Sequence, residues 1–121
     1  MRPRCYLSCP ITKGIRTENF ARACNTQAAL MDKGFAVLNP ALSMLHPDAW
    51  TIPHAVWIEN DLPWVSVCDV VLRLPGESAG ADEETRFAES QGIPVFTRWH
   101  DLMAWLQTWR AAQPRSVANG T

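Results

Sequence analysis

The chain has 121 residues, a length that is typical of one domain with a hydrophobic core of its own. Its 11 basic and 12 acidic residues give a formal net charge of −1 and are mixed along the sequence, which argues against the basic stripe of a protein that binds polymeric DNA or RNA. The N-terminus lacks the apolar stretch of a signal peptide, and no window approaches about 18 consecutive apolar residues. We therefore expect a cytoplasmic protein that has no contact with a membrane.

The cysteines do not predict a metal site. They form no CxxC pair and have no histidines at zinc-finger spacing: Cys5, Cys9, Cys24 and Cys68. Three of the four lie in apolar patterns, where a free cysteine behaves as a small buried hydrophobic residue. We expect reduced thiols and neither a metal nor another cofactor.

The first part of the chain reads as a strand, a helix and a second strand. A short buried strand at 4–9 leads into a turn at 10–14. Apolar residues then recur at helical spacing, with Thr17 as the expected N-cap and Gly34 as the expected stop. The apolar run FAVLNP at 35–40 predicts the second strand.

A polar segment with two prolines, 41–53, follows this unit. It is longer than most connections in compact domains, and such segments often have a function, for example as a lid. The next helix extends from Pro53 to Cys68 by its apolar spacing. Pro63 within it predicts either a kink or a helix that begins again near Asp61.

The second half repeats the alternation of strands and helices. The run DVVLRLP (69–75) has consecutive branched apolar side chains, as expected for an interior parallel strand covered on both faces. The acidic stretch GESAGADEET (76–85) opens a helix that extends to about Gln91. A strand at 93–96 and an amphipathic helix at 100–112 complete the pattern.

This alternation predicts a parallel sheet with helices on both faces. In such sheets a ligand binds at the carboxyl ends of the strands, which places the loops 10–14, 39–45 and 75–80 on one rim. We expect one domain over residues 1–113 and a disordered tail over residues 114–121.

The carboxylates of the stretch 76–85 are not equivalent. Ser78 is the expected N-cap, and acidic side chains in a first helical turn offset the partial positive charge there without having any function. Glu84 differs because it shares a helical face with Ala81 and Ala88, whose small side chains allow close packing on the sheet. We therefore expect Glu84 to point inward, where a positioned carboxylate can act as a nucleophile at a sugar carbon.

Three segments resemble the nucleoside 2-deoxyribosyltransferase-like superfamily, which includes deoxynucleoside 5′-monophosphate N-glycosidases: YLSCPIT (6–12), NDLPWVSVCDVVLRLP (60–75) and SAGADEETRFAESQGIPVF (78–96). The resemblance implies a single-domain α/β fold, a Rossmann-like or flavodoxin-like three-layer sandwich with a parallel sheet of roughly four to five strands. It also implies a homodimer or a larger homo-oligomer.

The superfamily motif has a glycine four residues before a nucleophilic glutamate, and the matching residues here are Gly80 and Glu84. The tyrosine on the family's first strand falls on Tyr6, and its catalytic aspartate falls on Asp61. The resemblance implies that Glu84 attacks C1′ of the sugar and that Tyr6 holds Glu84 in place. Asp61 would assist departure of the base or orient the sugar, with the two carboxyl groups roughly 5 to 5.5 Å apart by analogy with retaining glycosidases.

Ser78 indicates the substrate class within this resemblance. Deoxyribosyltransferases that act on free nucleosides carry an aspartate two residues before the motif glycine, whereas the monophosphate hydrolases carry a serine. A hydroxyl group and the amides of a helix N-terminus suit a phosphate, which favours a nucleoside 5′-monophosphate. The expected substrate contacts also include Gly80 and residues in and before the first loop: Ser8, Pro10, Ile11, Thr12 and Lys13.

Three positions depart from the pattern of the family. Cys9 replaces a glycine and would narrow the phosphate loop, and Pro10 replaces a serine. Arg86 replaces a glycine and is either a surface residue or a substrate contact. These departures affect the expected substrate and affinity more than the expected fold.

Side chains in and beside the segment 41–53 are candidates for contacts with the base. They are His46, Asp48, Trp50, His54 and Trp57. We favour His46 and Trp57 among them.

Three functions agree with the sequence. The leading hypothesis is hydrolysis of the N-glycosidic bond of a nucleoside 5′-monophosphate through a covalent intermediate on Glu84. Transfer of the sugar to a second base differs only in the acceptor. A nucleotide-binding or sensing module would keep the fold without catalysis, with Glu84 binding the ribose hydroxyls.

Overall fold

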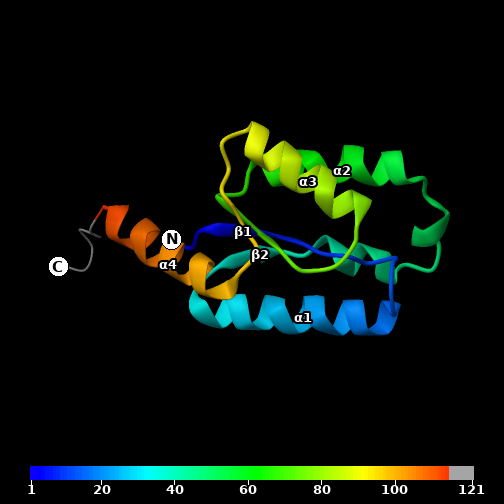
Figure 1. Ribbon diagram of the computed structural model, residues 1–121, viewed down its shortest axis with the longest axis horizontal. Helices are drawn as coiled ribbons and strands as arrows, with labels where there is room; N and C mark the ends of the chain where they lie inside the picture. The colour runs from blue at the N-terminus through cyan, green and yellow to red at the C-terminus, as the bar shows by residue number, and fades with distance from the viewer. Residues whose placement is uncertain (115–121) are drawn as a thin grey trace.

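The computed structural model describes residues 1–114 and shows a four-stranded parallel sheet in the strand order β2-β1-β3-β4 (Figure 1). The strands are β1 (Arg4–Ser8), β2 (Ala36–Leu38), β3 (Val70–Arg73) and β4 (Val95–Phe96). The helices are α1 (Arg16–Lys33), α2 (His54–Ser66), α3 (Ala79–Ser90) and α4 (Trp99–Ala112), with two short 3₁₀ helices, η1 (Pro40–Leu45) and η2 (Ala49–Thr51). The predicted α/β fold with a parallel sheet is confirmed.

The helices form a layer on each side of the sheet, with α1 and α4 on one face and α2 and α3 on the other (Figure 1). Side chains alternate between the two faces along β1, because neighbouring residues of a strand point in opposite directions. Cys5 and Leu7 join the hydrophobic core under α1 and α4, whereas Tyr6 joins the core under α2 and α3. The interior strand β1 is therefore buried on both faces, as expected for a parallel sheet.

The start of α1 differs from the prediction. The helix begins at Arg16, and Ile15 occupies the N-cap position without a side-chain cap, so the expectation that Thr17 is the N-cap is wrong. The buried Asn19 of this first turn instead turns back to the preceding loop and donates hydrogen bonds to the carbonyls of Ile11 and Lys13, at 3.1 and 2.7 Å. The first turn of α1 thereby fixes the loop that follows β1.

The end of α1 agrees with the prediction. Gly34 adopts a left-handed conformation with φ 106°, and its amide closes the last turn of the helix on the Met31 carbonyl at 3.1 Å. A glycine is favoured there because it has no Cβ to oppose a positive φ.

The helix α2 is continuous from His54 to Ser66, so the alternative of a helix that begins again near Asp61 is wrong. Pro63 lies inside it and cannot donate a hydrogen bond to the Glu59 carbonyl. Both residues are exposed, so water can bind this carbonyl and the cost of the proline stays small.

The segment between β2 and α2 is less irregular than its composition suggests, since it contains both η1 and η2. The disordered tail predicted from residue 114 falls, beyond Pro114, on residues that lie outside the described part of the chain. None of the helices within residues 1–114 has the length and apolarity needed to cross a membrane.

Candidate active site

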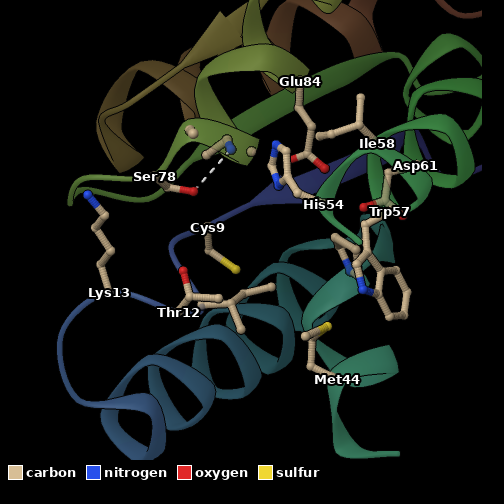
Figure 2. Close-up of a pocket in the computed structure, with 15 residues that line it drawn as sticks. Cys9, Thr12, Lys13, Met44, His54, Trp57, Ile58, Asp61, Ser78 and Glu84 are labelled. Atoms are coloured by element: carbon tan, nitrogen blue, oxygen red, sulfur yellow. Dashed lines mark hydrogen bonds between the residues drawn. The ribbon is translucent and has the colours of Figure 1, made fainter. Parts of the chain in front are cut away.

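A cavity of about 180 Å³ lies at the carboxyl ends of β1, β2 and β3 (Figure 2). The loops after these strands all contribute to its wall, so the three loops that we expected on one rim do meet there. They supply Cys9, Ile11, Thr12, Lys13, Pro40, Met44 and Ser78. The helices α2 and α3 supply His54, Trp57, Ile58, Asp61, Ala79, Gly80, Ala81 and Glu84.

Glu84 points from α3 toward the end of β1. It is only 5% exposed, and the residues that share its helical face, Ala81 and Ala88, are buried with it. Ser78 begins this helix as its N-cap, and its Oγ accepts a hydrogen bond from the amide of Ala81 at 3.1 Å. The predicted inward direction of Glu84 is confirmed.

Two hydroxyl groups of β1 hold the carboxylate of Glu84. The phenol of Tyr6 donates a hydrogen bond to Oε2, and the Ser8 hydroxyl donates one to Oε1 at 2.9 Å. Residues two apart on a strand face the same side, which is why both hydroxyls lie under α3. Ser8 is completely buried and does not line the cavity, so the structure makes it a partner of Glu84 instead of the substrate contact that we expected.

Burial raises the pKa of Glu84 to about 7, because an ionised carboxylate loses most of its hydration there. The hydrogen bonds from Tyr6 and Ser8 oppose this rise, since they favour the charged form. The negative charge of Asp61 adds to the rise, and the nearby Arg73 opposes it. Near neutral pH the group is therefore present in both its neutral and its ionised form.

Asp61 lies on α2, lines the cavity and is partly buried. Burial raises the pKa of its carboxyl above the ordinary value of 3.8, against hydrogen bonds with Asn60 and Glu84 that lower it. The Asp61 and Glu84 carboxyl groups are thus close enough for each to shift the pKa of the other. Two carboxyl groups with raised pKa values in one cavity can share the roles of acid and nucleophile.

Removing either β1 hydroxyl is expected to raise the pKa of Glu84 further. Ser8→Ala and Tyr6→Phe each delete one hydrogen bond that favours the carboxylate, so the ionisation of Glu84 should move above about pH 7. Carbon NMR titration of the Glu84 carboxyl measures this shift. Ser90→Ala, which deletes an exposed hydroxyl at the end of α3, should titrate as the wild type does, and an unchanged Glu84 titration in both β1 variants would contradict the assigned hydrogen bonds.

The acidic residues of the stretch 76–85 have different partners. Glu77 pairs with Lys13 at 2.9 Å, Asp82 with Arg73 at 3.1 Å, and Glu83 with His54 at 3.0 Å. Arg73 also donates to the carbonyls of Leu74 and Gly76, which fastens the loop between β3 and α3. Each acid is therefore attached to a different segment around the cavity.

One side of the cavity is largely apolar. Trp57 donates its indole N–H to the Ala49 carbonyl at 3.2 Å, which fixes the ring, and Met44 and Ile58 line the same cavity (Figure 2). Such a wall suits the face of a base. We did not predict Met44 and Ile58 as site residues, although Met44 lies in a loop that we expected on the rim and Ile58 follows Trp57 on the same helix.

Cys9 also lines the cavity, where burial raises the pKa of its thiol to about 12. It is therefore a neutral wall residue and not a nucleophile at physiological pH. Its side chain lies between Thr12 and the loop that bears Ser78 (Figure 2).

Besides Ser8, five further candidates for substrate contacts do not line the cavity: Pro10, His46, Asp48, Trp50 and Arg86. Pro10 packs against Gly76, where an added Cβ would lie 2.9 Å from the proline ring. His46 follows η1, and its Nδ1 accepts a hydrogen bond from the Asp48 amide at 3.1 Å, which stabilises a turn outside the cavity. Arg86 is exposed on α3, which favours the surface alternative.

No group of three or more histidine, cysteine, aspartate or glutamate side chains within residues 1–114 is placed to hold a metal ion. The side chains that line the cavity carry hydroxyl, carboxyl, thiol and apolar groups, together with one lysine and one histidine.

Comparisons with known proteins agree with this geometry at the level of the fold. The family model described as a domain of unknown function (DUF4406) matches residues 3–97. A solved structure of a 2-deoxyribosyltransferase from Bacillus psychrosaccharolyticus superimposes with a TM-score of 0.61 at 21% sequence identity, over 76% of this chain and 69% of that chain. Comparison with curated proteins gives no match.

Proposed function

The chain belongs to the family described as a domain of unknown function (DUF4406), and we propose that it cleaves the N-glycosidic bond of a nucleoside 5′-monophosphate. One observation carries this proposal. Glu84 is a buried carboxylate that borders a cavity, with a hydrogen bond to each of its oxygens and a second carboxyl group, Asp61, beside it. A fold shared with a 2-deoxyribosyltransferase supports chemistry at a sugar carbon.

In the proposed reaction the Glu84 carboxylate attacks C1′ of the sugar. The C1′–N bond breaks, the base leaves with the electron pair, and Asp61 supplies a proton to it. A water molecule then attacks C1′ of the sugar ester, gives its proton to Asp61 and releases the Glu84 carboxylate. Tyr6 and Ser8 hold Glu84 in one orientation throughout, because each donates to a different oxygen.

The end of the cavity near the start of α3 supports a phosphorylated substrate. The first turn of a helix has amide groups without internal acceptors, and here these are next to the cavity at Ala79 and Gly80. The Ser78 oxygen already accepts a hydrogen bond from Ala81, which leaves its own hydroxyl proton for a ligand. Thr12 and Lys13 line the cavity from the first loop and complete this end.

The substrate class can be tested without any mutation. The protein is incubated with a panel of deoxynucleoside and ribonucleoside 5′-monophosphates and the matching nucleosides, with and without an added base, and free base is measured by chromatography. We expect release of base from at least one monophosphate, faster than from its nucleoside. Release that requires an added base would instead support transfer of the sugar. The fold that the chain shares with the solved 2-deoxyribosyltransferase is compatible with this reaction too. No release at high protein concentration would contradict both reactions and favour the binding module.

Gly80→Ala is expected to separate stability from ligand binding. Gly80 has no positive φ, and a Cβ added to it would meet its nearest neighbour, His54, at 3.5 Å, which is ordinary contact. Alanine in a helix is favoured over glycine by up to about 1 kcal/mol, so the variant should unfold at an equal or higher temperature. The added methyl group fills space in the cavity, and we expect monophosphate binding to weaken by about fivefold or more. Thermal unfolding and calorimetric titration measure the two effects, and unchanged binding would show that the ligand does not approach Gly80.

A further inference from the structure

An exposed ion pair lies at the phosphate end of the cavity. The Lys13 ammonium, in the loop after β1, lies 2.9 Å from a carboxylate oxygen of Glu77, in the loop after β3. The side chains are 60% and 79% exposed. Lys13 lines the cavity, Glu77 directly precedes Ser78, and the lysine side chain extends toward the Ser78 loop (Figure 2).

The charges around the cavity make this lysine important for an anionic ligand. Among the lining residues, all of which lie in the described range 1–114, Lys13 is the single lysine or arginine, and it stands against the carboxyl groups of Glu84 and Asp61. A phosphate monoester carries a charge of about −1.5 to −2 at neutral pH. Lys13 is therefore the lining cation that can offset the charge of a phosphorylated ligand, and Glu77 neutralises it in the structure.

Lys13 can exchange Glu77 for a phosphate at a small cost in free energy. An ion pair as exposed as that of Lys13 and Glu77 is weak, because water competes for both groups and salt screens them. A phosphate would carry more charge than the Glu77 carboxylate and would also accept hydrogen bonds from the Ser78 hydroxyl and the first amides of α3. A nucleoside without a phosphate offers no such replacement and would leave the pair intact.

We propose that Glu77 is an intramolecular competitor of the substrate phosphate: it occupies Lys13 in the empty site and releases it when the phosphate binds. This inference rests on the proposed function, since it assumes a phosphorylated ligand. It assigns a specificity role to the one acid of the stretch 76–85 that neither faces the cavity nor supports α3. Glu77 would keep Lys13 from binding any passing anion and would lower the affinity for the correct one.

The test uses 2-deoxyribose 5-phosphate, which has no N-glycosidic bond, so its binding is measured without turnover. Calorimetric titration compares it with 2-deoxyribose for the wild type and for Glu77→Gln. We expect the variant to bind the sugar phosphate about 3- to 10-fold more tightly and the sugar with unchanged affinity. Glu89→Gln removes the same charge from an exposed position at the far end of α3 and should change neither affinity.

A double-mutant cycle separates release of Lys13 from simple repulsion between Glu77 and the phosphate. Lys13→Gln should lose most of the preference for the sugar phosphate, and Glu77→Gln should gain much less affinity in that background than in the wild type. An equal gain in both backgrounds, or no gain in either, would overturn the competition. A wild type that binds the sugar phosphate no better than the sugar would instead contradict the phosphorylated substrate of the proposed function.

Discussion

Replacement of Glu84 by glutamine is expected to lower base release by roughly 10³-fold or more, because the amide cannot form the sugar ester. The side chain keeps its size, its carbonyl oxygen can accept a hydrogen bond from one of the two hydroxyls, and its NH2 group can donate one to the other, so the site should retain its shape. Single-turnover measurements of base release, with the substrate identified in the panel, measure this effect. Activity near that of the wild type would show that the nucleophile is another group.

The same variant should be more stable than the wild type at alkaline pH. The pKa of Glu84 is about 7 in the folded protein and near its ordinary value of 4.5 in the unfolded chain, so the folded protein holds the proton more tightly. The stability that this proton provides is complete below about pH 4.5 and is lost as the pH rises through about 7. Above that range the buried charge lowers the free energy of unfolding of the wild type by about 3 kcal/mol. A neutral glutamine at this position avoids the loss.

Thermal and urea unfolding at pH 4.5 and pH 8 measure this prediction. Glu84→Gln should match the wild type at pH 4.5 and exceed it at pH 8. Glu89→Gln, which removes an exposed charge from the same helix, should show no such difference between the two pH values. An equal effect of Glu84→Gln at both pH values would contradict the raised pKa.

Asp61→Asn is expected to lower base release by about 10²- to 10⁴-fold, the usual contribution of a general acid or base. The residual activity should also show a changed pH dependence. The negative charge of Asp61 raises the pKa of Glu84, so its removal should move the acid limb of the rate profile to lower pH. This direction is opposite to that expected for Ser8→Ala and Tyr6→Phe, which lose hydrogen bonds to the carboxylate.

The pH dependence of kcat/KM measures the shift, and Glu59→Gln is the matched control. Glu59 is an exposed acid two residues earlier on α2, so its substitution removes the same charge outside the cavity. The control should keep both the rate and the position of the acid limb. A large loss of rate in Asp61→Asn with an unmoved acid limb would indicate that Asp61 acts without electrostatic contact with Glu84.

Local patterns in the sequence predicted much of the fold and one part of the site. Strand and helix positions follow from apolar spacing, and the end of α1 follows from the left-handed preference of Gly34. The inward direction of Glu84 follows from Ala81 and Ala88, which share its helical face. These predictions succeed because their causes lie within one or two helical turns of the residue concerned.

Other features could not be predicted from neighbouring residues. The N-cap prediction at Thr17 was wrong because the N-cap lies two residues earlier, at Ile15, and Asn19 holds the preceding loop through its side chain. Ser8 was expected to contact the substrate, but the register of β1 under α3 directs its hydroxyl to Glu84. In both cases a contact with another segment decides what a polar side chain does.

The sequence by itself determined the succession of strands and helices along the chain, the rim on which three loops meet, and the one acid of the stretch 76–85 that faces inward. Only the tertiary structure decided that Tyr6 and Ser8 bind the two oxygens of Glu84, across 78 and 76 residues of chain. It also decided that burial raises the pKa of Glu84 to about 7. The physical reason is that helix and strand patterns depend on nearby residues, whereas desolvation and hydrogen bonding depend on groups that only the packing of the sheet and helices brings together.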